Sequence, residues 1–183
     1  MTVTTAKWTI DEYHRMIAAG ILDDRRMELL KGEIVEMSPE GEPHAYFSSE
    51  AGEYLIKLLG ERATVRPSKP ITLPNNSEPE PDIAIVKRLG REYLEHHPYP
   101  ENIFWLIEYS DSSLDKDLKI KTKVYAEVEI AEYWVVNLRK RQVVVFRDPQ
   151  DGEYASKTTL ARGTIYPQAF PDLAISVSSI VNI

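Results

Sequence analysis

The sequence predicts a mixed α/β fold in which helices flank a central β-sheet, with an extra N-terminal hairpin and extra C-terminal strands. Two observations support this class. Helical periodicity marks residues 43–60 and 114–130, whereas the runs Ile83–Val86 and Ile103–Tyr109 are apolar, short and typical of buried strands. Helices and strands also alternate along the chain in a mixed order, which is typical of a sheet covered by helices.

The N-terminal third predicts one helix and the hairpin. Residues Trp8–Gly20 form the expected helix, with Thr9 as its N-cap. Met27–Leu30 and Glu33–Met37 form the two hairpin strands, and Gly32 lies in the turn between them.

The middle of the chain predicts a helix followed by the first sheet strands. The helix spans Pro43–Gly60 and ends on its glycine. Its apolar stripe consists of Phe47, Ala51, Tyr54, Leu55 and Leu58. Residues 64–73 are expected to be extended, 74–81 to be a turn-rich loop, and 87–102 to be an exposed loop or a short helix.

The C-terminal part predicts a second helix and a strand pair. The helix is expected over Leu114–Ile130, and Glu132–Leu138 should pair with Gln142–Arg147 across Arg139–Arg141. The glycines and prolines of the tail indicate further short strands and an irregular end.

Length and composition predict one cytoplasmic domain over residues 1–183. Hydrophobic residues make up 43% of the 183 residues, enough for a self-sufficient core. The absence of cysteine excludes disulfides, thiolate zinc sites and cysteine nucleophiles. The N-terminus lacks the apolar core of a secretion signal, and no apolar run is long enough to cross a bilayer, so no membrane contact is expected.

The net charge of −7 argues against a protein whose whole surface binds nucleic acid. Its 22 Lys and Arg residues stand against 29 Asp and Glu residues, whereas phosphate contacts require cations. A local basic patch or the groove of a symmetric dimer could override this average.

Two carboxylates interrupt the apolar strands. Alternation places Phe104, Leu106 and Glu108 on one strand face, where a buried acid needs a partner or a cation. Alternatively, the strand surfaces there and the carboxylate is solvated. Asp82 opens the other strand after Pro81, which is also common turn chemistry. If the strands are neighbours, both carboxylates lie at one end of the sheet and offer the oxygen ligands that Mg²⁺ or Mn²⁺ requires.

Lys121 differs from the other lysines of its predicted helix. At 100° per residue, the apolar side chains of this helix fall within an arc of about 120°, and Lys121 lies in the middle of it. Lys116, Lys119 and Lys123 project to the opposite side. An inward lysine near two carboxylates suits catalysis, although its stem could also extend past apolar neighbours to solvent.

His44 lies on the apolar stripe of its helix, in the first turn after Pro43. A histidine there is either a functional group or a satisfied, partly buried side chain. Glu28 and Glu33 in the preceding hairpin are possible supporting acids.

A proline–aspartate pair, a glutamate and a lysine in this order resemble the PD-(D/E)XK signature of nucleases. The longer match resembles the Uma-two family, a bacterial group of restriction-endonuclease-like proteins, and covers roughly residues 9–150. It is carried by Glu28–Pro39 with His44, by Glu80–Val86, and by Ile107-Glu108, Ser110–Ser113, Asp117, Lys121, Tyr125-Ala126 and Glu132–Val136.

One position departs from the general nuclease signature. The lysine should stand two residues after the glutamate, but that position is Ser110. The family is similar to nucleases whose lysine has moved to the following helix, which implies Lys121 here, with Lys123 as the alternative.

The resemblance implies a restriction-endonuclease-like fold and metal-assisted hydrolysis of DNA phosphodiester bonds. Asp82 and Glu108 would hold Mg²⁺ or Mn²⁺, with the Tyr109 carbonyl as a further ligand, and Lys121 would act on the attacking water or the phosphoryl oxygens. A homodimer is also implied, with the strands Tyr133–Leu138 and Gln142–Arg147 as one possible interface.

Two other functions compete with this one. The acidic charge and the lack of a specificity domain favour a binding or regulatory module that keeps the nuclease fold with weak or no hydrolysis. The charge also fits a metal-dependent phosphohydrolase acting on a small phosphorylated substrate.

Overall fold

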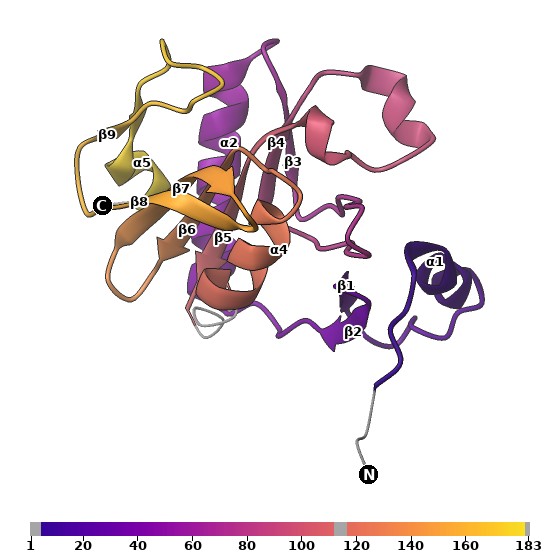
Figure 1. The fold of residues 1–183 in the computed structure, drawn as a ribbon. Coiled ribbons are helices and arrows are strands. Elements are labelled where there is room, and N and C mark those ends of the chain that lie inside the picture. The colour runs from indigo at the N-terminus through magenta and orange to yellow at the C-terminus, as the bar shows by residue number, and fades with distance from the viewer. Residues whose placement is uncertain (1–4, 112–116, 182–183) are drawn as a thin grey trace.

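The computed structural model describes residues 5–111 and 117–181. Its centre is a six-stranded sheet with the order β3-β4-β5-β6-β7-β8, in which β5 and β6 are parallel and every other neighbouring pair is antiparallel (Figure 1). The strands span Thr64–Pro67, Ile83–Val86, Ile103–Ser110, Glu132–Asn137, Gln142–Gln150 and Glu153–Leu160.

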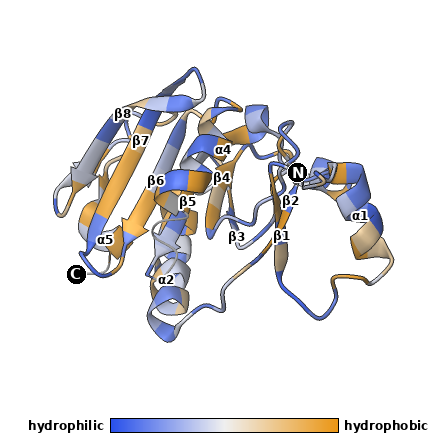
Figure 2. Ribbon diagram, turned by 60° about the horizontal axis from the view of Figure 1, so that its bottom comes forward, coloured by the Kyte–Doolittle hydropathy of each residue, from blue (hydrophilic) through white to orange (hydrophobic). Residues whose placement is uncertain are grey.

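Helices cover both faces of this sheet. Helices α2 (Glu42–Leu59) and α5 (Val177–Val181) pack on one face, where the predicted α2 stripe joins Trp105 and Trp134 in the core. A short π-helix, η3 (Asp117–Lys121), leads into α4 (Thr122–Ala126) on the other face (Figure 1). Hydrophobic residues dominate the middle strands in Figure 2. The mixed sheet between two layers of helices confirms the predicted mixed α/β class.

Strand register determines where the polar residues meet. In the antiparallel β4–β5 pair Ile83 lies opposite Ile107, which brings Asp82 level with Glu108. In the β3–β4 pair Pro67 lies opposite Ile83, so Ser68 reaches the same level and its amide donates to the Asp82 carbonyl at 2.9 Å. We call the edge of the sheet at which β4 begins and β5 ends, seen along the strand direction, the Asp82 end.

The N-terminal elements form a separate unit beside the sheet. Helix α1 (Ile10–Ala18) begins at the predicted N-cap Thr9, which forms a reciprocal capping box with Glu12. The predicted hairpin consists of β1 (Met27–Leu30) and β2 (Glu33–Glu36). Its attachment to the loop before β4 includes a hydrogen bond from the Glu78 amide to the Leu29 carbonyl at 2.7 Å. Figures 1 and 2 show α1 at the outer end of this unit.

Replacement of Gly32 by Ala is expected to destabilise the protein by about 1–3 kcal/mol. Gly32 has φ 76° and is buried, and a Cβ there would lie 3.0 Å from both the Lys7 Cβ and the Trp8 carbonyl oxygen. Gly90 also has a positive φ, and a Cβ there would have no atom within 4 Å, so Gly90→Ala is the matched control for backbone conformation without the steric contact. Urea unfolding measures the difference, and equal stability of the Gly32→Ala variant and wild type would contradict it.

Two predicted elements are shorter than expected. The extended segment 64–73 is a strand only as far as Pro67, because Ser68 has φ 46° and turns the chain. The helix expected over 114–130 ends at Ala126, and Glu129 has φ 60°. Its expected first residues, 114–116, lie outside the described residues. Segment 87–102 contains two 3₁₀ turns, η1 (Gly90–Leu94) and η2 (Pro100–Asn102).

The expected face of Phe104 is wrong. A bulge between β4 and β5 pairs Val86 with Ile103 but Ile85 with Trp105, which shifts the alternation at the start of β5. Phe104 therefore packs against Phe170 on the α2 face, whereas Leu106 belongs to the α4 face on which Glu108 contacts Tyr125.

The suggested dimer interface is also wrong. Strands β6 and β7 lie inside the sheet, and every residue of β6 is buried. The outermost strands of the sheet are β3 and β8.

In the C-terminal tail, short strands β9 (Thr164–Ile165) and β10 (Ile175–Ser176) pair with each other. Among the described residues, no helix is long and apolar enough to span a bilayer.

Candidate functional site

A pocket of about 470 Å³ opens at the Asp82 end of the sheet, between the hairpin, the N-terminus of α2 and the end of β5. Its lining is strongly acidic. Lys121 and His44 are the lining residues that can carry positive charge, and they face seven carboxylates. These are Glu28, Glu36, Glu40, Glu80, Asp82, Glu108 and Asp111.

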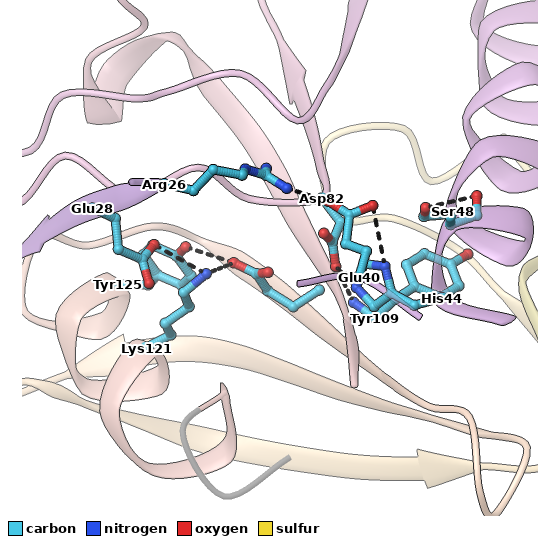
Figure 3. A network of polar contacts seen from close by, with 11 residues as sticks. Arg26, Glu28, Glu40, His44, Ser48, Asp82, Tyr109, Lys121 and Tyr125 are labelled. Atoms are coloured by element: carbon cyan, nitrogen blue, oxygen red, sulfur yellow. Dashed lines mark hydrogen bonds and ion pairs between the residues drawn. The ribbon is translucent and has the colours of Figure 1, made fainter. Parts of the chain in front are cut away.

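Asp82 is held in place by two donors. Its Oδ2 accepts a hydrogen bond from the Tyr109 amide at 2.6 Å, so the last part of β5 fixes the carboxylate that precedes β4. The same oxygen lies 3.0 Å from His44 Nε2 (Figure 3). The carboxylate is only 13% exposed, so its orientation is determined by these partners rather than by solvent.

His44 is positioned by the start of α2. The helix begins after Gly41 with Pro43 in its first turn, and this directs His44 back toward the sheet. Burial alone lowers the pKa of His44, but the hydrogen bond to Asp82 and the charges of Asp82, Glu40 and Glu108 outweigh it and raise the pKa above its usual value. The acidic surroundings therefore stabilise the protonated ring relative to the same ring in water, and a bound cation would take the place of that proton.

Glu40 is a site residue that the sequence reasoning missed. It precedes His44 by four residues, and its Oε2 lies 3.7 Å from His44 Nδ1. Glu40, His44 and Asp82 offer ligand atoms that all lie within 4.8 Å of one another. Arg26 donates to Glu40 at 3.0 Å and lies 3.6 Å from Glu80, which orients the outer wall of the pocket. The four-residue spacing to His44 at a helix start was the available signal.

A second, more buried group lies beside the first (Figure 3). Lys121 Nζ donates to Glu108 Oε1 at 2.6 Å, and the Tyr125 hydroxyl donates to the same oxygen at 3.0 Å. Lys121 and Glu108 are 3% and 4% exposed, so their interaction is poorly screened. Burial and the charge of Glu108 raise the pKa of Tyr125 well above its usual value, which keeps the phenol protonated as a donor.

Glu28 completes this buried group and Glu33 does not. Glu28 is fully buried, and its Oε2 lies 3.5 Å from Lys121 Nζ. Glu33 points away from the pocket and forms an exposed ion pair with Lys7 at 2.6 Å. The hairpin therefore contributes one of the two acids that the sequence suggested.

The predicted orientation of the lysines is confirmed where the structure describes them. Lys121 is buried, whereas Lys119 and Lys123 are exposed. Lys116, Ser112 and Ser113 lie outside the described residues. Asp82, Glu108, Lys121 and His44 thus line one pocket, although they come from four different segments of the chain.

A mixed sheet with two carboxylates that line one pocket, where β4 begins and β5 ends, is the arrangement expected of a restriction-endonuclease-like protein. The chain matches the family model Uma2, described as "Putative restriction endonuclease", over residues 10–178. It therefore belongs to the Uma2 (Uma-two) family of nuclease-like proteins, and the match includes the C-terminal strands beyond residue 150.

A solved structure supports the fold. A nuclease of the DUF820 group from Anabaena variabilis, described as putative, superimposes with a TM-score of 0.73. The alignment covers 95% of this chain and 97% of that protein at 16% sequence identity, which shows a shared fold. No curated protein matches this chain.

Proposed function

We propose that this protein is a metal-dependent endonuclease that hydrolyses DNA phosphodiester bonds with Asp82, Glu108 and Lys121. The observation that carries the proposal is the pocket at the Asp82 end, where seven carboxylates face Lys121 and His44 in a nuclease-like fold. Such an excess of negative charge would repel a phosphodiester, and a bound cation removes this repulsion.

The donor atoms fit a hard divalent cation. Asp82 and Glu108 would hold Mg²⁺ or Mn²⁺ through carboxylate oxygens, and Glu40 and His44 offer a further oxygen and a nitrogen beside Asp82. The imidazole favours Mn²⁺ over Mg²⁺ because nitrogen ligands suit transition metals better. When bound, the ion supplies Lewis acidity and lowers the pKa of a water molecule.

The protein groups then have separate roles. Lys121 would donate to a phosphoryl oxygen or to the attacking water while it orients Glu108, its 2.6 Å partner. His44 would hold Asp82 in place together with the Tyr109 amide. Tyr125 fixes the Glu108 carboxylate from the other side.

A phosphohydrolase acting on a small phosphorylated substrate is the second candidate. The pocket volume of about 470 Å³ falls in the range of small-molecule sites. An acidic chain of net charge −7 also repels a long polyanion more strongly than a single phosphate ester.

Cleavage of plasmid and single-stranded DNA with Mg²⁺ or Mn²⁺ tests the proposal. Wild type should cleave, and Asp82→Asn should lose both cleavage and calorimetric Mn²⁺ binding while its melting temperature stays near that of wild type. The matched control is Glu53→Gln, because Glu53 is an exposed acid in the same chain. Equal cleavage by wild type and Asp82→Asn would reject the assignment, and hydrolysis of small phosphate esters alone would favour the second candidate.

A further inference from the structure

A cluster of positive charge lies at the Asp82 end of the sheet, next to the acidic pocket. The turn between β6 and β7 contains three consecutive basic residues, Arg139, Lys140 and Arg141, and all three are exposed. Arg162, beyond the end of β8, is exposed as well. We call these four residues the basic turn cluster.

The strand order brings this cluster beside the pocket. Ser110 at the end of β5 pairs with Asn137 at the end of β6, and the Leu138 amide donates to the Ser110 carbonyl at 3.1 Å. Arg139 then donates to Asp111 at 2.6 Å, and Asp111 lines the pocket. The turn is therefore in direct contact with the pocket wall.

The cluster extends away from the pocket across the remaining strands. Leu160 of β8 pairs with Val143 of β7, so Arg162 and Arg141 lie at the same end of these two strands, the Asp82 end of the sheet. Neighbouring strands are about 4.8 Å apart, so the distance from β5 to β7 is about 10 Å. This distance corresponds to about three base-pair steps of 3.4 Å along the axis of a DNA duplex.

The basic turn cluster lies in segments of the chain that lack acidic residues. Segments 138–147 and 157–163 contain no acidic residue, although the whole chain has a net charge of −7. Among the residues that the structure describes, Lys140, Arg141 and Arg162 have no ion-pair partner, while Arg139 is paired with Asp111. Cations held at the surface without acidic partners are available to phosphates.

We propose that the basic turn cluster binds the backbone of the nucleic-acid substrate next to the bond at the pocket. This inference rests on the proposed function, because it assigns the substrate path of the same site. It also explains how an acidic protein could bind DNA, since the positive charge is concentrated where the strand must pass. Lys140 and Arg141 would contact phosphates on one side of the scissile bond.

Binding of fluorescein-labelled duplex and single-stranded DNA, measured by anisotropy with EDTA, tests this without requiring cleavage. The double variant Lys140→Glu/Arg141→Glu should bind at least tenfold more weakly than wild type at low salt. Its plot of log affinity against log salt should be flatter by about 0.7–0.9 for each lost phosphate contact. The matched control is Lys57→Glu/Arg88→Glu, which makes the same charge change at exposed positions. Lys57 lies near the C-terminus of α2 and Arg88 just after β4, both remote from the Asp82 end.

The outcomes separate this proposal from the catalytic one. Selective weakening by the turn variant supports the path even if wild type cleaves nothing with Mg²⁺ or Mn²⁺. Equal weakening by both double variants, or no DNA binding by wild type at low salt, would overturn it. If the melting temperature of the turn variant falls, Lys140→Gln and Arg162→Gln provide the same comparison, with a smaller loss for each charge removed.

Discussion

Replacement of Lys121 by Met is expected to reduce DNA cleavage by about 10²–10³-fold, the usual effect of losing one preorganised donor to developing charge. Lys121 is the cation that contacts both buried carboxylates of the pocket, at 2.6 Å from Glu108 and 3.5 Å from Glu28. Without its ammonium group these acids repel each other and the incoming phosphate. Rates are measured at a temperature well below the melting temperature of the variant.

Stability should fall in the same variant, because removal of one partner from a buried ion pair costs about 3–5 kcal/mol. Mn²⁺ should restore part of the melting temperature, since a cation bound by the folded state neutralises the same carboxylates. Lys123→Met is the matched control, because Lys123 lies two residues further on and is exposed. A comparable loss of cleavage in both variants would contradict the assignment of Lys121 and would support Lys123 as the catalytic lysine.

Replacement of Glu132 by Ala is expected to destabilise the protein by about 3–5 kcal/mol. At 2–4 °C for each kcal/mol, this corresponds to roughly 6–20 °C in melting temperature. Glu132 is fully buried at the start of β6. Its Oε1 accepts from Trp134 Nε1 at 2.7 Å and from Arg147 at 2.6 Å, and its Oε2 accepts from the Gln168 amide at 2.7 Å. The variant leaves all of these donors without their acceptor.

Cleavage by the folded Glu132→Ala protein should be unchanged, because Glu132 lies opposite Arg147, at the other end of the strands from Asp82. Glu95→Ala is the control for loss of an exposed acid and should stay within about 0.5 kcal/mol of wild type. The double variant Glu132→Leu/Arg147→Leu should recover only the part of the loss that the unpaired Arg147 causes, because Trp134 Nε1 and the Gln168 amide still lack their acceptor. Loss of cleavage by a Glu132→Ala protein that is still fully folded would show that Glu132 acts in the functional site and not only in stability.

The sequence predicted the residues that break an apolar pattern, because burial of a charge is costly and such breaks are visible in one dimension. Lys121 is the clearest case, since helical periodicity separated it from Lys119 and Lys123 and the structure has the same orientation. Glu108 and Asp82 stood out at the ends of apolar strands. Glu132 also interrupts an apolar segment, and the predicted pairing of its strand with Gln142–Arg147 was the signal that Arg147 could neutralise it.

The sequence pattern could not show which of the supporting acids belong to the pocket. Glu28 and Glu33 are both hairpin residues, yet Glu28 enters the pocket and Glu33 pairs with Lys7 on the surface. Glu40 precedes the helix, so its four-residue spacing to His44 became informative only once the start of α2 was known. These outcomes follow from how the hairpin and α2 dock, which involves contacts between residues far apart in the chain.

The sequence alone therefore determined the mixed α/β class, most of the strands and helices, and the four residues Asp82, Glu108, Lys121 and His44 that later proved to share a pocket. Local propensity and side-chain periodicity are properties of short segments, so they can be recognised in the sequence before the fold is known. Only the tertiary structure decided that β6 and β7 are interior strands, that Glu40 joins the site, and that the Arg139–Arg141 turn adjoins the pocket. Strand order and register depend on long-range pairing, and no segment of the sequence specifies that pairing by itself.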